Sequence, residues 1–153
     1  MKLAEIFKEC VFVKKIICLI ISVIMLLPTL TFADFLASDW AKEEVVKADK
    51  LGLVPDEMKN DDLTATITRE EFAGIAVKLL EAYSEGELQS YSGKFADIDG
   101  NPYEHYIRCA YYYGITNGIG KTEDGEIIFS PDELIKRQDL ATMFARVIKK
   151  IEF

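Results

Sequence analysis

Two segments of the chain combine basic side chains with the predicted start of a helix. They read Ile-Thr-Arg-Glu-Glu over residues 67–71 and Ile-Lys-Arg-Gln-Asp over residues 135–139. Arg69 and Arg137 each fall at the first helical position, where the helix dipole disfavours a cation. The free N–H groups of a helix start and a guanidinium fork together make a binding site for a carboxylate or a phosphate. The pattern therefore predicts an anion site that occurs twice, with Lys136 added in the second copy.

The first segment also contains a helix-capping pattern. Thr68 and Glu71 form T-x-x-E, in which the hydroxyl accepts a hydrogen bond from a backbone N–H and the carboxylate reaches back to the capping residue. A well-capped helix explains Thr68 and Glu71 without any ligand, and a solvated arginine at a helix start is tolerated. Both interpretations stay open: a helix cap alone, or a cap beside an anion site.

Other kinds of chemistry find little support in the sequence. His105 is the only histidine, and Cys109 lacks a recognisable catalytic partner, so nucleophilic catalysis and zinc binding are disfavoured. With 26 acidic residues in the chain, a pair of carboxylates that hydrolyses a glycan is the enzyme alternative. The sequence favours a binding module, with no metal and no cofactor, over an enzyme.

One acidic pattern resembles the start of a calcium loop. Asp97-x-Asp99-x-Asn101 has the spacing of the first ligands of an EF-hand. The next positions contradict it, because Pro102 stands where that loop needs glycine and Arg108 where it needs glutamate. The pattern is better interpreted as the lead into a capped helix.

An internal repeat supplies the elements that position these residues. After each arginine, apolar residues fall at i, i+3, i+4, i+7, i+8 and i+11, which is one face of an α-helix, and the two sets are offset by 68 residues. A shorter helix precedes each long one, ends at Gly52 or Gly114, and repeats with an offset of 62. The apolar positions are Phe72, Ile75, Ala76, Leu79, Leu80 and Tyr83, repeated as Leu140, Met143, Phe144, Val147, Ile148 and Ile151, and for the short helices Ala41, Val45 and Ala48, repeated as Tyr103, Ile107 and Ala110.

These patterns predict an all-α fold of two helix-loop-helix repeats packed as a small bundle. The first repeat covers residues 38–83, a polar linker covers 84–94, and the second repeat covers 95–151. Ser38 or Asp39 is expected to cap the first short helix, and Asn101-Pro102 to start the second. A short extended piece is expected near residues 127–129.

The N-terminus has the pattern of a secretory signal peptide. Four lysines precede an apolar run over residues 16–27, and the segment ends in small residues near Ala33. Residues 1–33 are therefore predicted to be removed on export, which would place the protein outside the cell. The alternative is an uncleaved membrane anchor, because the apolar stretch over 16–32 is nearly long enough to span a bilayer.

The charge of the remaining chain argues against a nucleic-acid partner. The whole chain has a formal charge of −8, and residues 1–33 carry four lysines and two acidic residues, so the remainder has −10. Such acidity favours solubility and repels phosphate backbones. Cys109 would be the only cysteine after cleavage, and its place in an apolar helix favours a buried thiol.

At this level of detail the chain resembles the S-layer homology repeat. The second copy shows Phe95-Ala-Asp97, a helix from Tyr103 to Gly114-Ile115, then Gly118, Phe129-Ser-Pro131 and Arg137. The first copy shows Trp40-Ala41, Ala48, Gly52-Leu53 and the Ile-Thr-Arg-Glu-Glu segment over 67–71. The resemblance covers essentially all of residues 38–150.

The resemblance implies non-covalent attachment to a polysaccharide of the bacterial cell wall, commonly a secondary polymer with pyruvylated sugars. The motif arginines would hold the acidic substituent. Grooves between the repeats would be lined by Trp40, Asp39, Asp97 and Tyr103, although an aromatic residue at such a position is more often simply part of the core.

Some positions depart from the family's pattern. The family usually has three repeats arranged as prongs, and only two are visible, so self-association or a partner's repeat would be needed to complete the module. Lys136 replaces threonine, Gln138-Asp139 replaces a small residue and glutamate, and the first repeat lacks a clean Phe-x-Pro. The alternative function is an interaction adaptor of the envelope that keeps the fold with a degenerate sugar site.

Overall fold

The computed structural model describes residues 35–84 and 86–152, which lie in one compact unit, Ala33–Phe153. The predicted signal peptide, like its alternative as a membrane anchor, falls outside the described residues. Among the helices that are described, none is long and apolar enough to cross a membrane.

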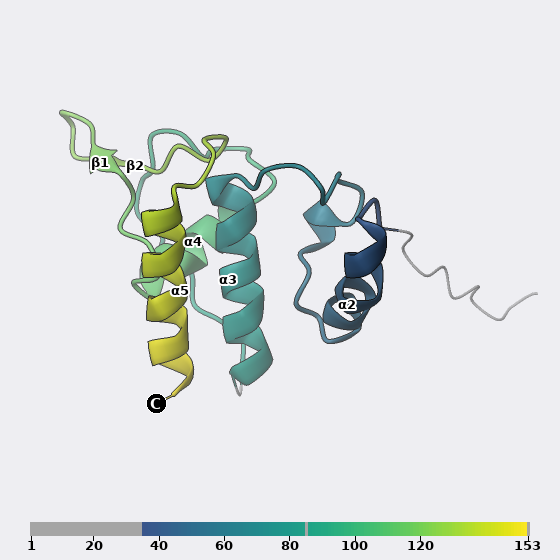
Figure 1. The fold of residues 1–153 in the computed structure, drawn as a ribbon. Coiled ribbons are helices and arrows are strands. Elements are labelled where there is room, and N and C mark those ends of the chain that lie inside the picture. The colour runs from purple at the N-terminus through teal and green to yellow at the C-terminus, as the bar shows by residue number, and fades with distance from the viewer. Residues whose placement is uncertain (1–34, 85, 153) are drawn as a thin grey trace, which may run out of the picture. The chain divides into compact units, whose positions relative to one another are not determined.

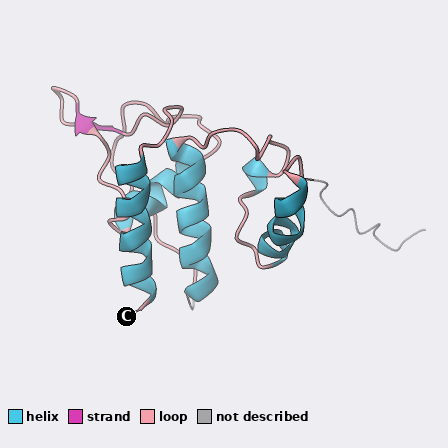
Figure 2. Cartoon of the chain, in the orientation of Figure 1, coloured by secondary structure: helices cyan, strands magenta, loops and turns pink. Residues whose placement is uncertain are grey.

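The chain folds into helices with one small sheet, which confirms the predicted helical class (Figures 1 and 2). Strands β1 and β2 pair antiparallel, with Gly120 opposite Ile128 and Lys121 opposite Ile127. The elements in chain order are α2 (Asp39–Lys50), the 3-10 helix η1 (Asp56–Met58), α3 (Arg69–Tyr83), α4 (Glu104–Tyr112), β1 (Gly120–Lys121), β2 (Ile127–Ile128) and α5 (Arg137–Ile151).

Both short helices end where the glycines predict. Gly52 has φ of +71° and Gly114 has φ of +68°, a region that residues with a Cβ rarely adopt. The helix starts differ from expectation. Ser38 is the N-cap of α2, but its hydroxyl makes no capping bond. The side chain of Asn101 accepts from the N–H of Tyr103 at 2.7 Å, and Pro102 lies in the turn before α4 rather than in its first position.

The core lies around α3, which packs against both α4 and α5 (Figure 1). Helix α4 therefore belongs to the second repeat in sequence but covers the long helix of the first repeat in space. The two short helices differ in burial: α4 buries Tyr106, Ile107, Cys109 and Ala110, whereas α2 buries none of its residues.

A backbone junction joins the start of α3 to the loop before α5. Thr68 and Leu134 form an antiparallel bridge. The N–H of Arg69 donates to the carbonyl of Glu133 at 2.9 Å, the N–H of Glu70 donates to Pro131, and the N–H of Ile135 donates to Ile67. The free N–H groups that open α3 are thus partly satisfied by the second repeat.

Candidate functional site

The start of α3 is built by the predicted capping box. The N–H of Glu71 donates to the Thr68 hydroxyl at 3.3 Å, and the N–H of Thr68 donates to the Glu71 carboxylate at 2.6 Å. These reciprocal bonds account for both side chains. The corresponding N-cap of α5 is Lys136, whose side chain makes no capping bond.

Arg69 is buried, with only 4% of its surface exposed. Its Nε donates to the carbonyl of Phe129 at 2.9 Å, and its Nη1 lies 3.3 Å from Oδ2 of Asp139. The guanidinium also stacks 4.9 Å from the centre of the Phe129 ring. Arg69 therefore joins α3 to the loop before α5 and to α5 itself. These contacts use Nε and Nη1, so Nη2 makes none of them.

Asp97 holds the loop that Arg69 contacts. Its carboxylate accepts from the N–H of Phe129 at 3.0 Å and from the N–H of Ser130 at 2.6 Å. Ser130 has φ of +56°, so two hydrogen bonds to a charged acceptor help to keep a turn that is strained for a residue with a Cβ. The structure explains Asp97 by this contact.

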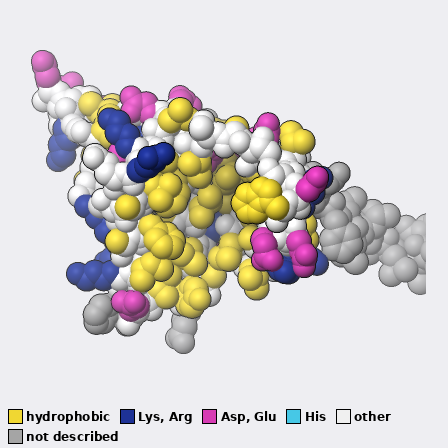
Figure 3. All heavy atoms as spheres, viewed as in Figure 1, with side chains coloured by type: hydrophobic (Ala, Val, Ile, Leu, Met, Phe, Trp, Pro, Cys, Tyr) yellow, Lys and Arg dark blue, Asp and Glu magenta, His cyan; other side chains and the backbone are white. Residues whose placement is uncertain are grey.

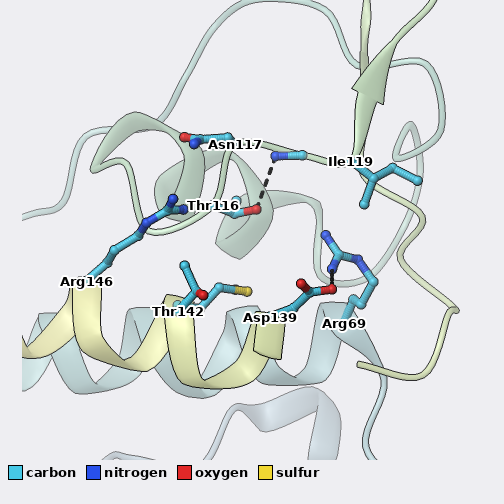
Figure 4. A pocket seen from close by; sticks show the side chains of 9 residues that line it. Arg69, Thr116, Asn117, Ile119, Asp139, Thr142 and Arg146 are labelled. Carbon is cyan, nitrogen blue, oxygen red and sulfur yellow. Dashed lines mark hydrogen bonds and ion pairs between the residues drawn. The ribbon is translucent and has the colours of Figure 1, made fainter. Parts of the chain in front are cut away.

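A pocket of about 320 Å³ lies beside Arg69, between α5 and the loop over residues 116–119 (Figure 4). We name it the arginine groove. Arg69 and Arg146 stand at opposite ends of it, and Asp139 projects between them beside Arg69. Its lining residues are Arg69, Thr116, Asn117, Gly118, Ile119, Asp139, Thr142, Met143 and Arg146.

The loop wall of the arginine groove depends on a glycine. Gly118 has φ of +74°, and a Cβ there would lie 2.6 Å from the carbonyl oxygen of Ile128. Its N–H donates to the Thr116 hydroxyl at 3.2 Å. The close approach lets the loop run against β2 while Asn117 stays exposed.

The groove offers more cationic than anionic charge. Arg146 donates from Nη1 to the carbonyl of Ile115 at 3.1 Å, which leaves its Nε and Nη2 free for a ligand. Asp139 neutralises part of the charge of Arg69 through their ion pair. Two arginines against one carboxylate give a net attraction for an anion of the size of a carboxylate.

Comparison with known proteins covers the loop wall of this groove and Asp139, but neither of its two arginines. The S-layer homology domain matches residues 94–141. That stretch is similar to an S-layer homology domain. It contains the loop over residues 116–119 and the first turn of α5, whereas the predicted first repeat, 38–83, lies outside the match.

Two longer proteins are similar to the chain. The exoglucanase XynX of Acetivibrio thermocellus is 27% identical over 125 residues, which cover 80% of this chain and 10% of that protein. The amylopullulanase of Thermoanaerobacterium thermosulfurigenes is 31% identical over 87 residues, 56% of this chain and 4% of that protein. The chain thus spans a tenth or less of these relatives. No solved structure matches it.

An S-layer homology domain is a binding domain that anchors its protein to the cell wall, and not a catalytic one. The family match therefore supports a surface role for this chain. In residues 35–84 and 86–152, no group of three or more His, Cys, Asp or Glu side chains is placed to hold a metal ion.

The structure separates the remaining predicted site residues from the arginine groove. Lys136 and Arg137 are exposed at the start of α5. Asp39 and Trp40 are exposed on α2, where Trp40 has 85% of its surface open. None of the four lines the groove. Of the two motif arginines, the geometry brings only Arg69 to it.

On α3, the place that corresponds to the arginine groove on α5 is filled by the ring of Tyr103. Its ring lies 3.2 Å from where a Cβ of Gly74 would be, and Pro55 lies at 2.9 Å. Gly74 corresponds to Thr142, a lining residue of the groove. The Tyr103 hydroxyl has no hydrogen-bond partner in the described part of the chain, and burial raises the pKa of Tyr103 above its ordinary range.

The sequence predicts only a small part of the groove. Gly118 stands out in it only as part of the family pattern, and Met143 only as a core position. Arg146 carried one signal, a cation directly before the buried Val147 in an apolar helix. Asp139 belongs to the segment over residues 135–139 that the sequence singles out. Asn117 and Thr142 carry no such signal, because their role depends on which loop lies opposite α5.

Cys109 is a core residue, as its helix predicted. It is fully buried, and burial, with a smaller effect of the Glu81 charge, raises the pKa of its thiol to about 11. His105 lies 3.6 Å away. A thiol protonated at neutral pH and shielded from solvent is a poor nucleophile.

Proposed function

We propose that the chain binds an acidic polysaccharide of the bacterial cell wall through the arginine groove and so anchors at the envelope. The observation that carries this proposal is the pair Arg69 and Arg146 at opposite ends of one groove. Free guanidinium donors facing an open pocket favour a carboxylate or phosphate substituent over a neutral sugar.

The size of the groove limits what it holds. At about 320 Å³ it lies at the small end of ligand pockets, which suits one substituted sugar residue rather than a long stretch of glycan. A pyruvylated sugar fits this description, because its ketal places a carboxylate on a compact ring. We propose such a sugar as the ligand.

Arg146→Ala tests the proposal with little risk to the fold. Arg146 makes one hydrogen bond, to Ile115, whereas Arg69 is buried among several partners. Loss of a charge-assisted contact should weaken wall binding about 10- to 100-fold. Lys150→Ala removes an exposed cation from the same helix and is the matched control. Binding of Arg146→Ala equal to that of the control would contradict the proposal.

The ligand itself is tested with purified walls. We would measure sedimentation of residues 33–153 with intact walls, with walls stripped of non-peptidoglycan polymers, and with walls treated with mild acid, which hydrolyses pyruvate ketals. Binding should be lost in both treatments. Binding to stripped walls would indicate peptidoglycan, loss only on stripping would exclude the ketal, and no binding to any wall would favour the adaptor function.

A further inference from the structure

A second pocket shares Arg146 with the arginine groove. It has a volume of about 390 Å³, compared with about 320 Å³ for the groove. Because Arg146 belongs to the lining of both, the two pockets meet at this side chain. We name the second one the lysine pocket, and its lining residues are Tyr113, Gly114, Arg146, Lys149 and Lys150.

One face of α5 forms a wall of both pockets. The α5 side chains that line them are, in chain order, Asp139, Thr142, Met143, Arg146, Lys149 and Lys150. Counted from the first, these positions are i, i+3, i+4, i+7, i+10 and i+11, which is one side of an α-helix. At about 1.5 Å per residue, they extend about 16 Å along the helix. The lysine pocket therefore continues the groove in the direction of the helix axis.

A single stretch of backbone, residues 113–119, forms the opposite wall. Residues 116–119 line the groove, and Tyr113 and Gly114 line the lysine pocket. Between them, the carbonyl of Ile115 accepts from Nη1 of Arg146 at 3.1 Å. Figure 4 shows Arg146 reaching from α5 towards this stretch, at the end of the groove away from Arg69. The hydrogen bond crosses from one wall to the other, so it divides one continuous trough into two compartments.

The lysine pocket is more cationic than the groove. Its lining has three cations and, within the described part of the chain, no carboxylate, whereas Asp139 neutralises part of the charge of the groove. The side chains of Lys149 and Lys150 are exposed and make no hydrogen bond or ion pair with another described residue. Figure 3 shows cationic side chains at the edge of α5 that faces away from α3. An anion in this pocket therefore meets no competing acidic group among the lining residues.

Tyr113 gives the lysine pocket an aromatic surface. Its hydroxyl accepts from the N–H of Gln89 at 3.1 Å, and its ring stands at 71° to that of Tyr112, with the ring centres 5.2 Å apart. Both contacts fix the orientation of a ring that is only half-buried. A fixed and accessible aromatic ring suits the apolar face of a sugar, and cations at its edge suit an acidic substituent.

The two lysines also have a simpler explanation. They lie in the last turn of α5, where the helix dipole favours a cation. This effect accounts for their charge, but not for the pocket, the aromatic ring or the shared Arg146. The pocket and its continuity with the groove therefore carry the inference, and the lysines add the charge that selects the ligand.

We propose that the lysine pocket is a second subsite, which binds the acidic sugar residue next to the one held in the arginine groove. The ligand is then a glycan with acidic groups on at least two successive residues. This inference rests on the proposed wall binding and adds the length and the charge pattern of its ligand. Arg146 contacts both residues, since Nη1 is bound to Ile115 and Nε and Nη2 remain for the two acidic groups.

Removal of one lysine should affect only the second sugar residue. Lys150→Ala leaves the groove and Lys149 in place, and an exposed cation contributes little, so binding should weaken by less than about threefold. Arg146→Ala removes a contact to both sugar residues and should weaken binding more. Lys150→Ala therefore still serves as the control for Arg146→Ala.

Short and long fragments of the wall polymer test the second subsite. The polymer released from purified walls is cut, and fragments with one acidic residue are separated from fragments with several. Residues 33–153 form one compact unit that contains the hydrophobic core, and isothermal titration calorimetry measures their affinity for both kinds of fragment. We expect the longer fragments to bind at least about tenfold more tightly, because a second charge-assisted contact is gained.

Lys149→Glu should remove this gain. It places a carboxylate beside the second acidic group, so the longer fragments should bind at least about fivefold more weakly, and the shortest should bind within about twofold of the unmodified chain. Lys121→Glu makes the same change of charge at an exposed site on β1 and is the matched control. Circular dichroism would show that both variants are folded.

Tyr113→Leu tests the aromatic surface without a change of charge. Loss of the ring should weaken binding of the longer fragments by about two- to tenfold. Tyr112→Leu removes a neighbouring ring that is 53% exposed and does not line the pocket, so it should leave the affinity unchanged.

Three results would overturn the inference. Equal affinity for short and long fragments would do so while leaving the effect of Arg146→Ala, and with it the proposed wall binding, intact. A gain with length that Lys149→Glu reduces no more than Lys121→Glu does, or that folded Tyr113→Leu retains in full, would place the second residue elsewhere. Failure of every fragment to bind the unmodified chain would remove the wall binding, and this inference with it.

Discussion

At the scale of single residues, equivalent positions in the two repeats have unequal surroundings. Arg69 and Arg137 both open a long helix, yet Arg69 is buried against Phe129 and Asp139 while Arg137 is exposed. The difference arises because a loop of the second repeat covers α3. The same motif residue is therefore buried in one copy and exposed in the other, according to what lies opposite it.

The surroundings of Glu70 also change its properties, and the effect can be measured as a change of stability with pH. It accepts from the Asn101 side chain at 2.6 Å, but burial outweighs this bond and raises the pKa of Glu70, with smaller contributions from Asp132 and Glu71. A raised folded pKa means that the contribution to the free energy of unfolding is largest below the ordinary pKa and falls as pH rises through the raised pKa.

Glu70→Gln removes this titration and keeps an oxygen that can accept from Asn101. We expect the variant to gain stability relative to the unmodified chain as pH goes from acidic to neutral, measured by urea unfolding. Glu123→Gln, an exposed site in the turn between β1 and β2, controls for removal of one charge. A stability difference that shrinks towards neutral pH would contradict the assignment of burial as the main cause.

At the scale of elements, the two long helices begin differently. Helix α3 has a complete capping box, and its first N–H groups also donate to the second repeat. Helix α5 has Lys136 as its N-cap and no side-chain cap. No side chain therefore caps the N–H groups at the start of α5.

Replacing the N-cap residues Thr68 and Lys136 should show which helix start depends on a side-chain cap. Thr68→Ala removes the hydroxyl that accepts from Glu71 and should lower the free energy of unfolding by about 0.5 to 2 kcal/mol. Lys136→Ala removes no capping bond and should change it by less than about 0.5 kcal/mol. Thermal and urea unfolding would measure both, and equal effects would argue against a structural role for the capping box.

At the scale of the whole molecule, overall charge and local charge oppose each other. The chain has a formal charge of −8, and the part after residue 33 has −10, yet the arginine groove has two cations and one carboxylate among its lining residues. The proposed acidic polymer would be repelled at long range and attracted at contact. Salt screens the long-range part first.

The rate of association with an acidic wall polymer should therefore rise with salt at first. From about 0.01 M to about 0.15 M salt the Debye length falls from roughly 30 Å to roughly 8 Å, so the repulsion fades while contacts of a few ångströms persist. Surface plasmon resonance on immobilised polymer would measure this rate. A rate that falls steadily over the same range would show that attraction dominates at all distances.

The sequence by itself determined the helices and their approximate ends, and it predicts their repeat relation. Apolar periodicity, Gly52 and Gly114, and the Thr68 and Glu71 pattern act within one or two turns of chain, so they can be interpreted locally. The family pattern over the second repeat also consists of short motifs within a single stretch of chain. The S-layer homology match to residues 94–141 confirms the predicted resemblance there.

Only the tertiary structure decided which residues share a site. The groove depends on α5 lying opposite the loop over residues 116–119 and on α3 bringing Arg69 to the same place from 47 to 50 residues earlier in the chain. Packing of α4 on α3 likewise filled one position with Tyr103 and left its counterpart on α5 open. Long-range pairing is set by the summed burial of many side chains, which no short segment encodes by itself.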